Sequence, residues 1–199
     1  MNKLVKLYFL FMAAIGLAAC QANTLNGSDD MNVAVANADV SQEFLDLFDY
    51  ELQNRAFALN LMEAAVEKGE GDQALPFAKA YLALEKLNQR HFAPAAKAYN
   101  LDMKPRWWTR TRTSLAKLGT ALMPETSLKT VHRVTVKYVE QLQRLEAISP
   151  ARDKKFFGYV VAQEEAQAEA VGLVLVGNID QAAMLLNNFV QQHQDHNFY

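Results

Sequence analysis

Residues 41–68, SQEFLDLFDYELQNRAFALNLMEAAVEK, predict a long amphipathic helix at the start of the folded part of this chain of 199 residues. The apolar residues of this segment recur every three or four positions, as on one face of an α-helix: Phe44, Phe48, Leu52, Leu59, Met62 and Val66. Ser41 is a good N-cap, and Gly69-Glu70-Gly71 supplies a stop. At about 100° per residue, Glu51 and Arg55 fall in the middle of the apolar face.

The rest of the folded part predicts further helices, separated by proline and glycine. We expect these helices over residues 72–91, 109–122, 125–148, 152–176 and 178–193, with an irregular connection over 95–108. Pro94 and Pro150 separate helices, and Gly177-Asn178 joins the last two. Short connections between long amphipathic helices imply antiparallel neighbours. The sequence therefore predicts an all-α fold, an antiparallel four-helix bundle with one or two additional short helices.

Polar residues interrupt the apolar faces of three of these helices. The predicted buried polar layer consists of Glu51, Arg55, Asn88, His91, Glu164 and Gln167. Buried charges are costly unless they are paired or bound to a metal. The favoured interpretation is structural: Arg55 pairs with Glu51, Glu164 or both, and the amides and the imidazole complete the hydrogen bonds.

The same layer resembles the ferritin-like carboxylate bundles, in which two helices each give a Glu and two give Glu-x-x-His. The resemblance is incomplete, because residues 88–91 read Asn-Gln-Arg-His and residues 164–167 read Glu-Glu-Ala-Gln. As an alternative it implies an oxidase or metal-binding protein with iron, manganese or zinc at Glu51, His91 and Glu164. Two carboxylates and one imidazole cannot hold two irons, and Arg55 would repel a cation. We therefore expect no cofactor and no catalytic residue.

The first 19 residues have the pattern of a secretory signal peptide. Lys3 and Lys6 precede an apolar run over residues 7–17, which is shorter than the roughly 20 residues that span a bilayer. Leu17-Ala18-Ala19-Cys20 resembles the lipobox of bacterial lipoproteins, which implies cleavage before Cys20 and acylation of that residue. Cys20 is the only cysteine in the chain. Because Gln21 and not aspartate follows it, the resemblance implies the outer membrane of a Gram-negative bacterium, facing the periplasm.

The region between the cysteine and the first helix predicts a flexible tether. Residues 21–40 are rich in Asn, Asp and Ala and contain no aromatic residue. Residues 41–199 have the length of one domain with a single core. The formal net charge of −2 argues against binding to nucleic acid, because no basic excess is present to neutralise phosphates.

A basic stretch with two tryptophans is a second candidate site. It contains Lys104, Arg106, Trp107, Trp108, Arg110 and Arg112. Such a surface suits a membrane interface, an anionic cell-wall glycan or an acidic periplasmic protein. Alternatively, the tryptophans close the end of the bundle and the arginines form its solvated rim.

A third interpretation comes from residues 177–183, GNIDQAA, which resemble the turn of tetratricopeptide repeats. That resemblance implies a helical adaptor for a protein partner, with Glu51 and Glu164 exposed. The interpretation that we favour is a membrane-anchored periplasmic lipoprotein with a non-catalytic binding or scaffolding role.

Overall fold

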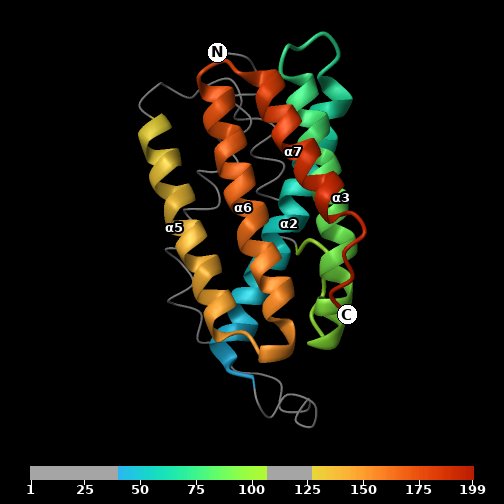
Figure 1. Ribbon diagram of the computed structural model, residues 1–199, viewed down its shortest axis with the longest axis vertical. Coiled ribbons are helices and arrows are strands. Elements are labelled where there is room, and N and C mark those ends of the chain that lie inside the picture. The colour runs from blue at the N-terminus through green and yellow to red at the C-terminus, as the bar shows by residue number, and fades with distance from the viewer. Residues whose placement is uncertain (1–39, 107–126) are drawn as a thin grey trace.

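The computed structural model describes residues 40–106 and 127–199, and within these ranges every regular element is helical (Figure 1). The described elements are α2 (Gln42–Lys68), α3 (Leu75–Ala98), α5 (Ser127–Ile148), the 3-10 helix η3 (Ala151–Asp153), α6 (Lys154–Leu175) and α7 (Ile179–His193). The predicted all-α class is confirmed for this part of the chain. The helix expected over residues 109–122 lies outside the described residues.

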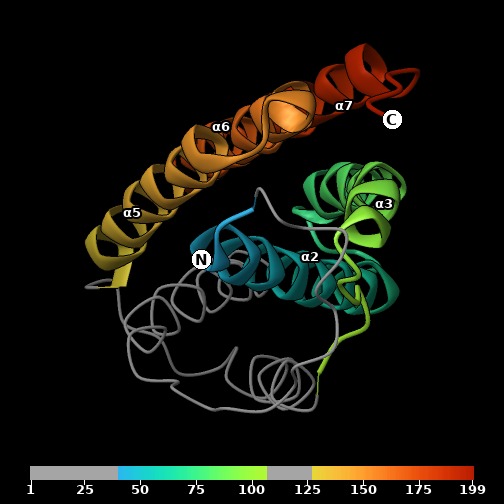
Figure 2. The same cartoon turned by 90° about the horizontal axis from the view of Figure 1, so that it is seen from below.

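The described helices form two layers. α5, α6 and α7 lie in one layer, and α2 and α3 lie in the other (Figure 2). Helices that follow one another, α2 and α3 or α5, α6 and α7, run antiparallel, whereas α3 and α7 lie side by side and run in the same direction (Figure 1). The arrangement therefore differs from a strictly antiparallel bundle at the α3–α7 pair.

The N-cap of α2 and the glycine of the α6–α7 turn are as predicted, whereas the expected capping by Asn178 is not. The side-chain oxygen of Ser41 accepts a hydrogen bond of 3.2 Å from the backbone N–H of Phe44. At the α6–α7 turn, Gly177 has a φ of +85°, a backbone conformation that glycine adopts without steric cost. Asn178 stands at the N-cap position of α7, but its side chain makes no capping hydrogen bond.

The predicted end of the second helix was wrong. We expected a helix that ends near His91 before Pro94, but α3 continues through Pro94 to Ala98. Pro94 has no N–H to donate to the carbonyl oxygen four residues earlier in the helix. Because Pro94 lies on the exposed side of α3, water can bind that carbonyl instead. Phe92 and Ala95 are fully buried and hold the last turns of α3 against the core.

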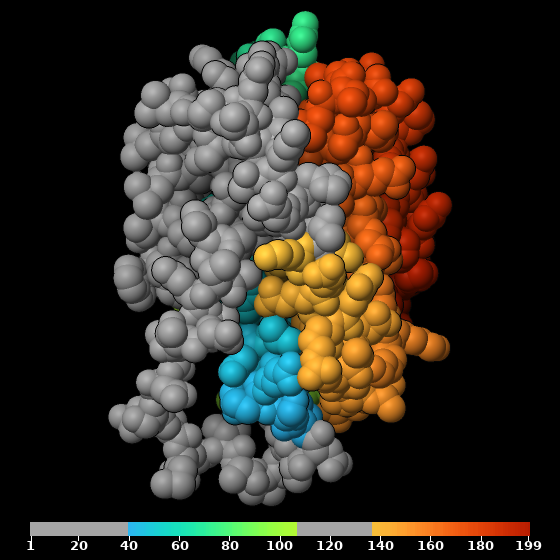
Figure 3. Space-filling model, turned by 90° about the vertical axis from the view of Figure 1, so that its left-hand side faces the viewer, coloured from blue at the N-terminus to red at the C-terminus, as the bar shows by residue number. Residues whose placement is uncertain are grey.

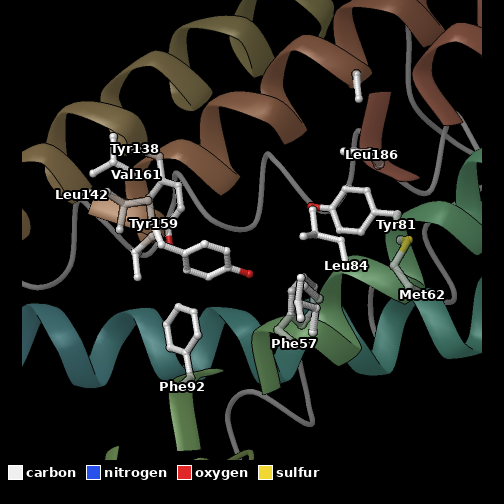
Figure 4. Close-up of a cluster of buried hydrophobic side chains, with 14 of the residues drawn as sticks. Phe57, Met62, Tyr81, Leu84, Phe92, Tyr138, Leu142, Tyr159, Val161 and Leu186 are labelled. Atoms are coloured by element: carbon white, nitrogen blue, oxygen red, sulfur yellow. The ribbon is translucent and has the colours of Figure 1, made fainter. Parts of the chain in front are cut away.

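An aromatic cluster fills one end of the core. Its fully buried members come from α2, α3 and α6, and they are Phe44, Phe48, Phe92, Phe156 and Phe157. The rings of Phe92 and Phe156 meet edge to face, with centroids 5.0 Å apart. Core side chains from both layers converge in Figure 4. Along α2 and α6, the buried polar residues follow this aromatic cluster. Buried apolar residues such as Leu61 and Val174 come after the polar ones.

The first turns of α2 lie beside α5 on one face of the molecule (Figure 3). There Arg144 of α5 donates two hydrogen bonds to the carboxylate of Glu43, at 3.0 and 3.1 Å. Both side chains are more than half exposed, so this ion pair stabilises the fold only slightly. No helix in the described ranges is both long enough and apolar enough to cross a membrane.

Candidate functional site: a buried polar layer

The guanidinium of Arg55 lies between carboxylates from three helices. Nη1 donates a hydrogen bond of 3.0 Å to Glu85 Oε1 from α3, and Nη2 donates one of 3.0 Å to Glu164 Oε2 from α6. Nε lies 3.0 Å from Oε1 of Glu51, one turn earlier on α2, in an ion pair whose geometry is not that of a hydrogen bond. The Arg55 side chain is 3% exposed and the three glutamates are fully buried.

Side-chain amides link these charges. Arg55 Nη1 is also 3.1 Å from the Gln163 carbonyl oxygen and 3.3 Å from that of Gln167, which both accept from it. Gln167 Nε2 donates to Glu85 Oε1 at 3.0 Å, and Asn88 Nδ2 donates to Glu85 Oε2 at 3.3 Å. Glu85 therefore accepts from one cation and two amides, which favours its ionised form.

Tyrosine hydroxyl groups from three helices close the network. Tyr138 of α5 donates to Glu51 Oε2 and accepts a hydrogen bond of 2.9 Å from Asn54 Nδ2. Tyr81 of α3 donates to the Gln167 carbonyl oxygen at 2.6 Å, and Tyr159 of α6 donates to Asn88 Oδ1 at 2.6 Å. Figure 4 shows these tyrosines among the apolar core residues, so each brings a polar end to an otherwise apolar region.

The layer contains more negative than positive charge. Burial raises the pKa of Glu51 to about 7, against the lowering effect of Arg55. Burial also raises the pKa values of Glu85 and Glu164, and Arg55 again acts in the opposite direction. Glu164 Oε1 is buried and has no hydrogen-bond partner. One guanidinium thus faces three carboxylates in a region that water does not reach.

Five of the six residues predicted for this layer lie together in the structure: Glu51, Arg55, Asn88, Glu164 and Gln167. The exception is His91, whose Nε2 lies 3.0 Å from the backbone oxygen of His193. Its ring meets those of Tyr159 and Phe198 edge to face. Because His91 is held by the C-terminal end of the chain, its imidazole does not join Glu51 and Glu164. Across residues 40–106 and 127–199, no group of three or more His, Cys, Asp or Glu residues is placed to hold a metal ion.

Sequence reasoning missed Glu85 and Gln163, which are central to the network. Glu85 is four residues after Tyr81 and three before Asn88, so these positions share one helix face. Gln163 precedes Gln167 by four residues, and their side chains are hydrogen bonded at 2.8 Å. A search for polar residues at these spacings from Asn88 and Gln167 would have found both.

Only the first part of the basic aromatic stretch is described. Arg106 Nη2 pairs with Asp49 Oδ1 at 2.7 Å, and its backbone N–H donates to Gln53 Oε1 at 3.0 Å. The Gln53 amide also donates to the backbone oxygen of Lys104 at 3.2 Å, which fixes this segment on α2. The remaining predicted residues, Trp107, Trp108, Arg110 and Arg112, lie outside the described residues, as does Cys20.

Comparisons with known proteins give no relative for this chain. No family model matches its sequence, and the comparisons with curated proteins and with solved structures find no match either.

Proposed function

We propose that this chain is a membrane-anchored periplasmic lipoprotein with a non-catalytic binding or scaffolding role. In this proposal its folded part is a ferritin-like helical bundle in which Arg55 takes the place of metal ions. The observation that carries the proposal is the position of the Arg55 guanidinium, within 3.0 Å of carboxylate oxygens from Glu51, Glu85 and Glu164.

The distribution of polar residues over the helices supports the likeness to ferritin-like bundles. In those bundles two helices each give a Glu, and the other two each give a Glu and a His three residues later. Here α2 gives Glu51, while α3 and α6 give pairs with the same spacing: Glu85 with Asn88, and Glu164 with Gln167. On α5, Tyr138 reaches the layer where such a bundle has its other Glu.

The residues of the layer do not fit a metal centre. Asn88 and Gln167 stand where imidazole ligands are expected, and their amide groups serve the hydrogen-bond network instead. The positive charge of Arg55 among the carboxylates would repel a metal ion. Because the guanidinium already neutralises part of their charge, the layer is suited to holding three helices together.

Burial of the layer favours a bundle over the tetratricopeptide-like alternative. In that alternative Glu51 and Glu164 would be exposed on a concave surface, but both are fully buried and both pair with Arg55.

Elemental analysis tests the metal-free layer. The full-length chain is purified from membranes in detergent without chelator, alongside its Glu164→Gln variant. We expect iron, manganese and zinc to be far below one per chain in both proteins. Near-stoichiometric metal in the unchanged protein that the Glu164→Gln variant loses would overturn the proposal and support a metal-dependent bundle oxidase.

The anchor is proposed from residues 17–20 and is tested through Cys20. The unchanged protein is expected to incorporate labelled palmitate and to stay in the outer-membrane fraction after a salt wash. Cys20→Ser should abolish the labelling and leave the longer precursor. Normal processing of the Cys20→Ser variant would contradict the lipid anchor.

A further inference from the structure

The three buried carboxylates differ in how many hydrogen-bond donors reach them. The Glu85 carboxylate accepts hydrogen bonds from Arg55, Gln167 and Asn88. In contrast, Glu51 and Glu164 each have one oxygen, Oε1, without any hydrogen bond. A buried ionised carboxylate needs donors on both oxygens or a cation of its own. All three carboxylates lie 3.0 Å from the guanidinium, so Glu85, with its two additional amide donors, is the best stabilised as an anion, and Glu51 and Glu164 are stabilised less.

Glu51 and Glu164 also repel each other. Their oxygens each lie 3.0 Å from a different nitrogen of the same guanidinium, Nε for Glu51 and Nη2 for Glu164. Two buried carboxylates so close to one planar group cannot both ionise without a large cost, and a pair of this kind takes up a proton.

We propose that Glu51 and Glu164 together form a buried proton-binding site, which holds one proton near neutral pH and loses it in mildly alkaline solution. The layer then has one ionised glutamate beside Arg55 and one further negative charge, which the pair shares. This inference rests on the part of the proposed function in which Arg55, and not a metal, is the cation.

Among the side chains that the structure describes, Arg55 is the cation that acts on both carboxylates of the pair. The titratable and charged groups that act on Glu51 from the described helices are Arg55 of α2, Glu85 of α3, Tyr138 of α5 and Glu164 itself. Tyr81 of α3 and Tyr159 of α6 donate to the neighbouring amides of Gln167 and Asn88. The buried face of α7 is apolar there and consists of Ala182, Ala183 and Leu186. The pKa of Glu51 near 7 agrees with a proton that is bound at neutral pH.

Tyr138 connects the proton to the docking of α5. Its hydroxyl donates to Glu51 Oε2, and a hydrogen bond to a charged acceptor is stronger than one to a neutral acid. The charge on Glu51 therefore changes how firmly α5 is held on α2.

The first measurement is infrared difference spectroscopy of the folded full-length chain in detergent. A protonated-carboxyl C=O band should be present near pH 6 and should be lost by about pH 9. The band should be absent in Glu164→Gln and in Glu51→Gln, and it should remain in the control Glu43→Gln, whose glutamate is exposed and ion paired. Absence of any such band in the unchanged folded protein would overturn the proposal without reference to a variant.

The second measurement is urea unfolding as a function of pH. A carboxyl whose pKa is higher in the folded state stabilises the fold below its unfolded pKa and loses that effect as the pH rises through the folded pKa. With values of about 4.5 unfolded and about 7 folded, the unfolding constant should rise roughly 70-fold between about pH 5 and about pH 8. The rise should be several-fold smaller in Glu164→Gln, and an equal rise in both proteins would overturn the proposal.

Metal analysis of the same preparations separates the two proposals. If the protein is metal-free and its stability does not fall with rising pH, the proton-binding site is contradicted and the proposed function is not. A missing pH effect in protein that holds near-stoichiometric metal contradicts the proposed function as well.

Discussion

Tyr138 stabilises the buried carboxylate of Glu51 through a single hydroxyl group. Its hydroxyl is the hydrogen-bond donor to Glu51 Oε2 and the acceptor for the Asn54 amide. Removing the hydroxyl leaves both partners buried without this bond. An unsatisfied buried polar group costs about 1–3 kcal/mol, and more when it is charged.

Tyr138→Phe should therefore lower the free energy of unfolding by about 2 kcal/mol at neutral pH. The measurement is urea unfolding of the full-length chain in detergent. In a Glu51→Gln background the same change should cost less, because the acceptor is then neutral, and the coupling should exceed about 0.5 kcal/mol. Equal costs in the two backgrounds would mean that the hydroxyl does not act through Glu51.

Single residues of the layer could be predicted only where they interrupt an apolar face. Glu51 and Arg55 lie between Phe48 and Leu59 on such a face, so their burial and pairing could be expected. Glu85 has leucines at positions 84 and 87 on either side, and its place depends on which side of α3 meets α6. That choice is made by packing between helices, which a helical period alone does not contain.

Helix α3 shows why one helix end was misjudged. Proline in a helix interior removes one hydrogen bond and clashes with the preceding turn, so Pro94 was expected to end the helix. Burial of Phe92, Ala95 and Ala96 compensates for this cost, and the sequence pattern gave no measure of it. The start of α2 at Ser41 could be predicted because an N-cap acts locally.

Pro94→Ala should stabilise the protein by about 1 kcal/mol or more, because alanine restores an N–H donor and removes the clash. The control is Pro76→Ala, since Pro76 lies in the first turn of α3, where no intrahelical partner is lost. Thermal and urea unfolding of both variants check this expectation. A loss of stability in Pro94→Ala would show that the end of α3 needs the proline.

The molecule as a whole joins its two layers of helices through charge as well as through apolar contact. Aromatic and aliphatic residues lie on both sides of the polar layer, and Arg55 links α2 to α3 and α6 across it. The all-helical class followed from composition and periodicity. The parallel α3–α7 contact did not, because the order of helices around the core depends on long-range packing.

Arg55 is the cation of the buried layer, and the free energy of unfolding of Arg55→Met tests this role most directly. Methionine keeps an unbranched apolar stem but removes the guanidinium, which leaves three buried carboxylates without a positive charge. We predict a loss of about 3–5 kcal/mol at neutral pH, much of it regained when Glu51→Gln and Glu164→Gln are added. A loss within about 0.5 kcal/mol, as at an ordinary surface position, would contradict the account.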